Sequence, residues 1–230
     1  MKAGTTLLLV LFLYTSFAQN AYNTVTPTRA ILPPPTYLRD VFTTPIQSKP
    51  HAGIQGTCFL EDKWTLARLK VEGRKEVIDS FHIKINVYDT KIHFMEKGVE
   101  METTLKVEEI KIIDTESAFY NKTFLSNFDQ ESGFFEVLAE GGKWKVLKRH
   151  RVYLWESKPL GMEPQKRFEA GEELYFSSNR VLYKANKSCT FLKDTFGNNK
   201  KIFDYISENN IRCNKEEDMR KLIAFVASLQ

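Results

Sequence analysis

The feature that most limits the fold of this chain is the alternation of apolar and polar residues between Ile54 and Lys184. In the segment Phe81–Val87, apolar side chains occupy every second position, so they lie on one face of an extended strand. An amphipathic helix would instead repeat its apolar residues three or four positions apart. The alternation therefore predicts a long antiparallel β-meander.

Two turn signals suggest a strand register. Asp89-Thr90 and Lys97-Gly98 are the expected two-residue turns, and glycine favours the second because it accepts positive φ. With these turns, Phe94 faces Ile85 on one neighbouring strand and Met101 on the other, so the apolar faces agree. A shift of one residue would expose all of them. Further strands are expected at residues 57–60, 64–71, 105–113, 117–125, 133–138, 143–155, 172–177 and 180–184.

The period becomes helical after Lys184. Ser188 is the expected cap of a short helix ending near Phe196-Gly197, and Asn214 that of a last helix with Glu217 in a capping box. A helix between these two stops at Asn209 and carries Ile202, Phe203 and Ile206 on one face. The last helix carries an apolar stripe of Met219, Leu222, Ile223, Val226 and Leu229. The expected fold is mainly β (α+β): an antiparallel meander forming a curved sheet or open barrel, with a small C-terminal helical segment.

The first residues predict export. Lys2, the apolar run Leu7–Leu13 and the small residues Ser16 and Ala18 are typical of a secretory signal peptide, here residues 1–18. The run is shorter than the ~20 residues that span a bilayer, so we expect a chain that does not cross the membrane and is periplasmic or extracellular. Residues 19–52, with six of the eight prolines, are interpreted as a leader. Residues 53–184 are the expected β domain, and the helices at 185–230 belong to the same globular unit.

Composition and motifs exclude some functions. Hydrophobic residues make up 42% of the chain, enough for a packed core. The net charge is +4, and loss of Lys2 would leave +3, too small a surplus to indicate nucleic acid. Sequence patterns of the common serine hydrolases, zinc proteases and nucleotide-binding proteins do not occur. We therefore assign no catalytic residue, no metal ligand and no cofactor.

Three polar residues on the meander form a candidate row. In the register above, His93 opposes Asn86 on one strand and Glu102 on the other, on the face away from the core. A histidine between an amide and a carboxylate is a candidate oriented base. An attacking Ser or Cys is not placed beside it, and a carboxylate facing a histidine is also an ordinary cross-strand pair. We favour a solvated sheet face.

The densest basic stretch is the second candidate. Lys143, Lys145, Arg149 and Arg151 share one face of a strand if no bulge intervenes. They form a candidate anion site for a lipid headgroup, a phosphate or an acidic glycan. The alternative, which we favour, is that the cations discourage edge-to-edge aggregation.

The three cysteines leave two alternatives open. Cys189 and Cys213 both fall in the helical segment and form a candidate disulfide in an oxidising compartment. Alternatively, they and Cys58 are buried thiols.

Four segments carry a resemblance to a known group of proteins. GTCFLEDKW, INVYDTKIHF, FFEVLAEGGKWKVLKRH and KIFDYISENNIRCNKEEDMRKLIAF resemble a family of uncharacterised secreted bacterial β-rich proteins. The family has no known activity, so the resemblance implies the fold and no site residue.

These observations favour an exported, non-enzymatic structural or interaction module of the periplasm or cell envelope, with an unidentified envelope or extracellular partner. A carrier of a lipid or other hydrophobic ligand in a half-barrel cavity is the first alternative. A hydrolase with dispersed carboxylates is the second.

Overall fold

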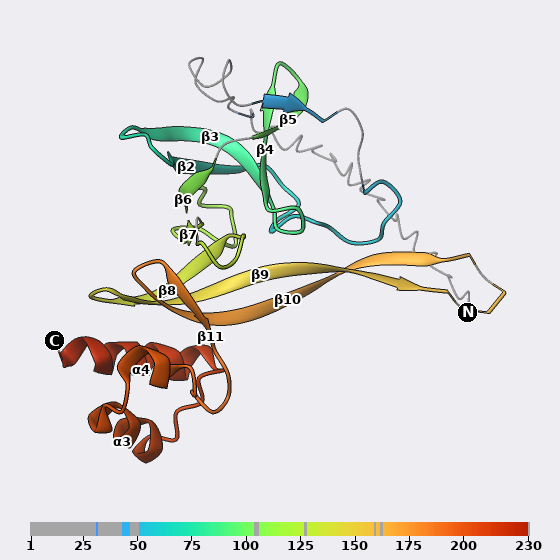
Figure 1. Ribbon diagram of the computed structural model, residues 1–230. Coiled ribbons are helices and arrows are strands. Elements are labelled where there is room, and N and C mark those ends of the chain that lie inside the picture. The colour runs from blue at the N-terminus through green and yellow to red at the C-terminus, as the bar shows by residue number, and fades with distance from the viewer. Residues whose placement is uncertain are drawn as a thin grey trace, which may run out of the picture. The chain divides into compact units, whose positions relative to one another are not determined.

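The computed structural model describes residues 31, 43–46, 51–103, 106–126, 128–158, 160–161 and 163–229, which belong to the unit Ile31–Gln230. Within this part of the chain, 11 strands form one sheet and three helices follow (Figure 1). The strands are β1 (Thr43–Pro45), β2 (Thr65–Val71), β3 (Val77–Asn86), β4 (Lys91–Glu96), β5 (Val99–Thr103), β6 (Val107–Ile112), β7 (Thr123–Leu125), β8 (Phe135–Gly141), β9 (Trp144–Ser157), β10 (Gln165–Ser178) and β11 (Val181–Lys184). The helices are α2 (Leu192–Phe196), α3 (Lys200–Glu208) and α4 (Glu216–Ser228).

The sheet is antiparallel and open. Its strand order is β1-β5-β4-β3-β2-β6-β7-β8-β9-β10-β11, so two meanders join where β2 pairs with β6, and β1 and β11 form the edges. The predicted fold class, a mainly-β antiparallel meander followed by a small helical segment, is therefore confirmed. The expected forms were a curved sheet or an open barrel, and the sheet is not closed, since β1 and β11 do not pair.

The register of β3, β4 and β5 is partly the predicted one. Lys97 and Gly98 form the tight turn between β4 and β5, both with positive φ (48° and 81°), and Phe94 pairs with Met101. The turn at Asp89-Thr90 is wrong, because residues 87–90 all lie between the strands and Ile83, not Ile85, pairs with Phe94. This shift of two residues keeps every side chain on its predicted face.

Three expected strands have different bounds. Residues 117–125 form a strand only at Thr123–Leu125, because the chain turns at Ser117–Asn121, where Asn121 has a φ of 61°. Residues 57–60 contribute a single bridge, from Phe59 to Asn86. β10 begins at Gln165 rather than Glu172. The first half of this strand was missed because it is exposed and polar and so lacks the apolar alternation that marks a strand.

The hairpin of β9 and β10 extends beyond the rest of the sheet as a two-stranded ribbon (Figure 1). The two strands pair without interruption, from Trp144 opposite Ser178 at one end to Ser157 opposite Gln165 at the other. β8 accompanies β9 only as far as Arg149. The outer part of the ribbon therefore has neighbours on fewer sides, and it carries the exposed aromatic residues described below.

The core consists of three clusters of buried side chains. One lies on β2–β7 and contains Phe81, Phe94 and Phe124. A second joins β8–β10 to the helices, and a small third one, Phe135, Leu147 and Tyr175, covers part of the opposite face of the same strands. Both faces of β8–β10 are thus covered near the helices, which explains why Val146 and Leu147 are both fully buried.

The helices end as expected but begin differently. α3 ends at Glu208, before the predicted stop at Asn209. The predicted N-caps Ser188 and Asn214 are wrong, because Phe191 and Lys215 occupy the cap positions of α2 and α4. Met219, Leu222, Ile223 and Val226 form the buried stripe of α4, whereas Leu229 is 40% exposed. A Cβ on Gly141 of β8 would lie 2.9 Å from Cβ of Ala227, so α4 packs closely on the sheet.

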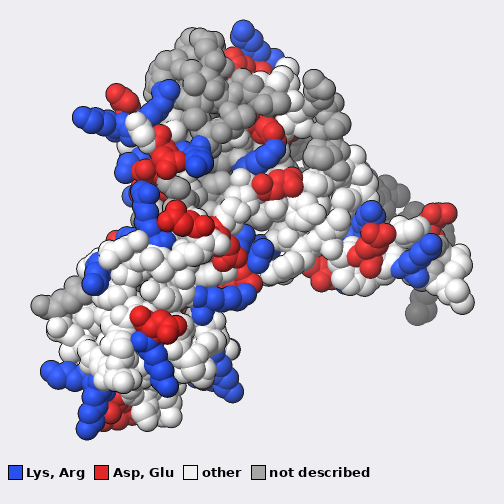
Figure 2. Space-filling model, viewed as in Figure 1, with Lys and Arg blue, Asp and Glu red and all other residues white. Residues whose placement is uncertain are grey.

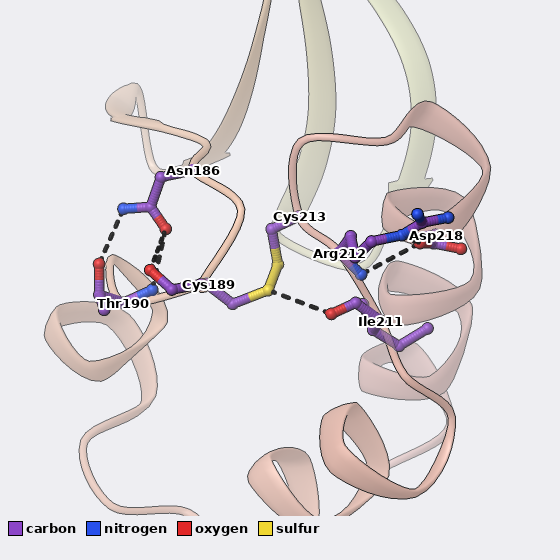
Figure 3. Close-up of a disulfide and its surroundings, with 8 residues drawn as sticks. Asn186, Cys189, Thr190, Ile211, Arg212, Cys213 and Asp218 are labelled. Atoms are coloured by element: carbon purple, nitrogen blue, oxygen red, sulfur yellow. Dashed lines mark hydrogen bonds and ion pairs between the residues drawn. A yellow bond between two sulfur atoms is a disulfide. The ribbon is translucent and has the colours of Figure 1, made fainter.

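A disulfide joins Cys189 to Cys213, with their Cα atoms 5.2 Å apart (Figure 3). It closes a loop that contains α2 and α3. On one side, the Asn186 side chain accepts the backbone N–H of Thr190, and on the other, Asp218 accepts the backbone N–H of Arg212. Both sulfurs belong to the buried helical cluster. The pairing left open by the sequence is therefore the one present in the structure.

Candidate functional site

The predicted polar row is buried. Asn86 and His93 are 2% and 6% exposed, because the segment around Phe59 crosses their face of the sheet. The rings of Phe59 and His93 meet edge to face with centroids 5.1 Å apart. The prediction of a solvated face is therefore wrong. The register also places Lys84, not Asn86, directly opposite His93, while Glu102 stands on its other side as predicted.

Beside this covered row lies a pocket of about 260 Å³, here called the His93 pocket. It is lined by parts of segment 51–62, by residues of β3, β4 and β5, and by Phe168 of β10. Small-molecule sites have volumes of about 300–1,000 Å³. The His93 pocket is slightly smaller, a size suited to a small ligand or to a single side chain of a larger partner.

His93 is oriented by a carboxylate that the sequence interpretation missed. Its Nδ1 lies 2.9 Å from Oε1 of Glu100, whereas Glu102 pairs with Lys91 at 2.6 Å. Glu100 is the diagonal neighbour of His93 across β4 and β5. Diagonal positions are within reach of long side chains, so the sequence pattern contained this signal.

Lys84 brings a fixed cation to the pocket. Its Nζ lies 3.1 Å from Oδ1 of Asp62, 5.0 Å from the ring centroid of Phe59 and 5.4 Å from that of Trp64. An ammonium group over an aromatic face is attracted by the ring quadrupole. The carboxylate and the two rings therefore hold Lys84 in place.

His51 joins the pocket to the ribbon. Its Nε2 lies 3.0 Å from Oδ2 of Asp89, which also accepts a hydrogen bond from the Asn86 amide. The His51 ring packs edge-on against Tyr88 and Phe168, both with centroids 5.2 Å away. Sequence patterns gave no signal for this contact, because residues 51, 88 and 168 are distant in the chain.

Cys58 is the thiol of the pocket, and burial raises its pKa to about 11. The thiolate, rather than the thiol, is the nucleophile in cysteine chemistry. Cys58 is therefore protonated at neutral pH and is not activated for attack. Among the described residues, groups of three or more His, Cys, Asp or Glu that could hold a metal ion are absent.

Several carboxyl groups have a lowered pKa. Burial favours the neutral forms of Glu136, Glu173 and Glu216, but hydrogen bonds from neighbouring side chains outweigh it and lower the pKa. A hydrogen bond from Ser80 has the same effect on the pKa of Asp79. A hydrolase with dispersed carboxylates needs one with a raised pKa as its general acid, so these groups do not favour that alternative.

Three of the four residues of the predicted anion site pair with carboxylates. These pairs are Lys145–Glu140, Arg149–Glu131 and Arg151–Glu173. Lys143 lies in the turn before β9, with its Nζ 4.9 Å from the ring centroid of Trp144. On the face shown in Figure 2, cationic and anionic side chains are interspersed over the described surface. The anion site stays a prediction, and its charges are largely compensated within the chain.

The ribbon exposes three consecutive large side chains, Tyr153, Leu154 and Trp155, which are 46%, 37% and 40% exposed. Tyr153 and Trp155 share one face, where the guanidinium of Arg151 lies 5.5 Å from the Tyr153 centroid and that of Arg167 4.3 Å from the Trp155 centroid. Tyr, Trp and Arg are the residues enriched at the energetic centres of protein interfaces. The ribbon is therefore a second candidate contact surface.

The phenylalanines on which the carrier hypothesis depended are largely packed in the core. Phe81, Phe94, Phe124, Phe135 and Phe176 are each at most 5% exposed. They belong to all three core clusters, so they offer little free surface to an apolar ligand.

The helices that the structure describes all lack the length and apolar character needed to cross a membrane. No protein-family model, curated protein or solved structure matches this chain. The resemblance to secreted bacterial proteins therefore stays a prediction.

Proposed function

We propose that this protein is an exported, non-enzymatic interaction module of the periplasm or cell envelope, and that its His93 pocket receives a side chain of a partner protein. The observation that carries the proposal is that the ionisable groups around the pocket are already held in place. The pairs are His93–Glu100, Lys84–Asp62 and His51–Asp89. Groups fixed before binding lose little conformational entropy when a partner arrives.

The size and lining of the pocket support a side chain as its occupant. Partner side chains that anchor protein interfaces insert into small, well-packed pockets. The His93 pocket combines aromatic walls from Phe59 and Phe168 with charged groups from Lys84 and Glu100. Such a mixed lining contacts the apolar body of a side chain and also its polar end.

Two observations support export. The signal-peptide pattern of residues 1–18 is the first. The disulfide between Cys189 and Cys213 is the second, because disulfides persist mainly in oxidising compartments outside the cytosol.

Site-specific photo-crosslinking in the producing cell tests the proposal. A photoreactive amino acid at Ala52, an exposed residue that lines the pocket, should yield a discrete cross-linked protein. Thr57→Trp in the same background fills the pocket from a half-buried position and should abolish that product.

The matched control carries the same photoreactive residue at Lys187, which is exposed and belongs to the helical segment. It should not give the product. The same product from both positions, or a product that persists with Thr57→Trp, would rule out the pocket as the binding site.

A further inference from the structure

The outer edge of β9 beyond Arg149 has features of an interaction surface separate from the His93 pocket. β8 pairs with this edge only as far as Arg149, and among the described residues no other strand continues the ladder. The opposite side of the ribbon differs, since the outer edge of β10 hydrogen-bonds to Gln55 through Lys166 and Phe168. The backbone groups of Arg151–Ser157 that point away from β10 therefore lie at an open sheet edge.

The central part of this edge lacks the usual protection against strand pairing. Natural sheets protect free edges with charged side chains, especially lysine, and with proline, bulges or very short strands. The stretch Arg151–Ser157 reads RVYLWES, and its two charges, Arg151 and Glu156, flank the uncharged residues Val152–Trp155. It contains no proline and pairs with β10 without a bulge. It also holds the three exposed residues Tyr153, Leu154 and Trp155. Exposed apolar groups beside an open edge mark it as a site for an added strand.

We propose that a second copy of this chain pairs with β9 in an antiparallel, two-fold symmetric manner, with Leu154 on the symmetry axis. Two limits set this register. The added strand must stop short of Arg149, where β8 begins to pair, and β9 itself ends at Ser157. Leu154 is the midpoint of Arg151–Ser157, so pairing about Leu154 places the entire stretch of both copies in the ladder.

The side chains match in this register. Because a two-fold axis perpendicular to the sheet preserves its faces, Tyr153 lies opposite Trp155 of the second copy, and Trp155 opposite its Tyr153. The four rings form one cluster, and aromatic pairs are among the favourable cross-strand pairs. On the other face, Leu154 meets its own counterpart. Pairing thus covers the three exposed side chains together and removes an open edge from each copy.

Sedimentation analysis of the purified protein at about 1–100 µM tests the proposal. We expect a monomer–dimer equilibrium whose dissociation constant rises at least about tenfold with Leu154→Lys, because two ammonium groups then meet at the axis. Leu229→Lys, at a similarly exposed position at the end of α4, should leave the equilibrium unchanged. A monomer at every concentration overturns the proposal, as does an equal effect of both lysines.

Cross-linking tests the register and does not depend on the lysine variants folding. Leu154→Cys should form a covalent dimer on mild oxidation, because the two thiols face each other across the axis. Tyr153→Cys should cross-link much less, since its counterpart is two residues further along the partner strand. The buried Cys58 of the unmodified chain gives the background. Stronger cross-linking by Tyr153→Cys, or none above background by Leu154→Cys, overturns the register.

Discussion

His93 and Phe94 are adjacent on β4 and buried on opposite faces, which makes them a sensitive pair of positions for mutation. His93→Ala removes the contact with Glu100 and the edge contact with Phe59, and it should lower the free energy of unfolding by about 1–3 kcal/mol. Phe94→Ala leaves a cavity in the core and should cost about 3–5 kcal/mol. Urea unfolding of the two variants measures both changes.

The control for His93 is Lys91→Ala, on the same face of β4 but exposed, which should change stability by about 0.5 kcal/mol or less. If His93→Ala is as mild as this control, the face is solvated and the His93 pocket is not formed as described.

At these two residues, the sequence predicts which face of the sheet each side chain occupies, but not whether that face is covered. Alternation places Phe94 on the core face and His93 on the other, and both assignments are confirmed. The cover over His93 comes from Phe59, which approaches through a single bridge and not through a strand with its own pattern. Contacts of this kind depend on tertiary packing, which local periodicity does not encode.

α4 is attached to the sheet by one buried stripe, and one position on the helix and one directly after it test this. Val226 is 2% and Leu229 40% exposed, although both fit the same helical period. Val226→Asp should destabilise the protein by about 3 kcal/mol or more, because it buries a charge without a partner. Leu229→Asp should stay within about 0.5 kcal/mol. Thermal and urea unfolding compare them; similar losses would mean that α4 docks through a different face.

The ion pairs of Glu136 on β8 also predict a pH dependence. Glu136 is 4% exposed and lies 2.8 Å from His150 and 3.0 Å from Lys122. Burial opposes ionisation of Glu136, but these hydrogen bonds outweigh it and lower its pKa below the usual value of a glutamate. A carboxyl group with a lowered folded-state pKa stabilises the fold above its unfolded-state pKa, and this contribution is lost as pH falls through the folded-state value.

The wild-type protein should therefore lose more stability between about pH 5 and pH 3 than Glu136→Gln, measured by urea unfolding at each pH. Glu217→Gln, at an exposed position of α4, should keep the wild-type slope. A Glu136→Gln variant with an unchanged slope would show that this carboxylate does not contribute to acid unfolding.

For the whole molecule, the antiparallel hairpins and the helical end could be predicted from period and turns, while the pairing of β2 with β6 and the contacts that close the fold could not. Arg180, in the turn between β10 and β11, lies 3.6 Å from Glu108 of β6. Phe168 similarly reaches His51 across the chain. Such contacts depend on the twist and coiling of the sheet, which accumulate over many strands.

Export and disulfide formation belong together at this scale, and one sample tests both. If residues 1–18 are a signal peptide, protein recovered from outside the cytoplasm should begin at or near Gln19 by N-terminal sequencing. A thiol reagent applied to the unfolded, unreduced protein should modify Cys58 alone, and after reduction also Cys189 and Cys213. Closing the loop between these two cysteines stabilises the fold by about 3 kcal/mol in the chain-entropy account, so reduction should also lower the unfolding midpoint.

Mature protein that retains Leu7–Leu13 would contradict export. Correctly processed protein in which all three thiols react before reduction would instead contradict the disulfide, because processing shows that the chain had reached an oxidising compartment.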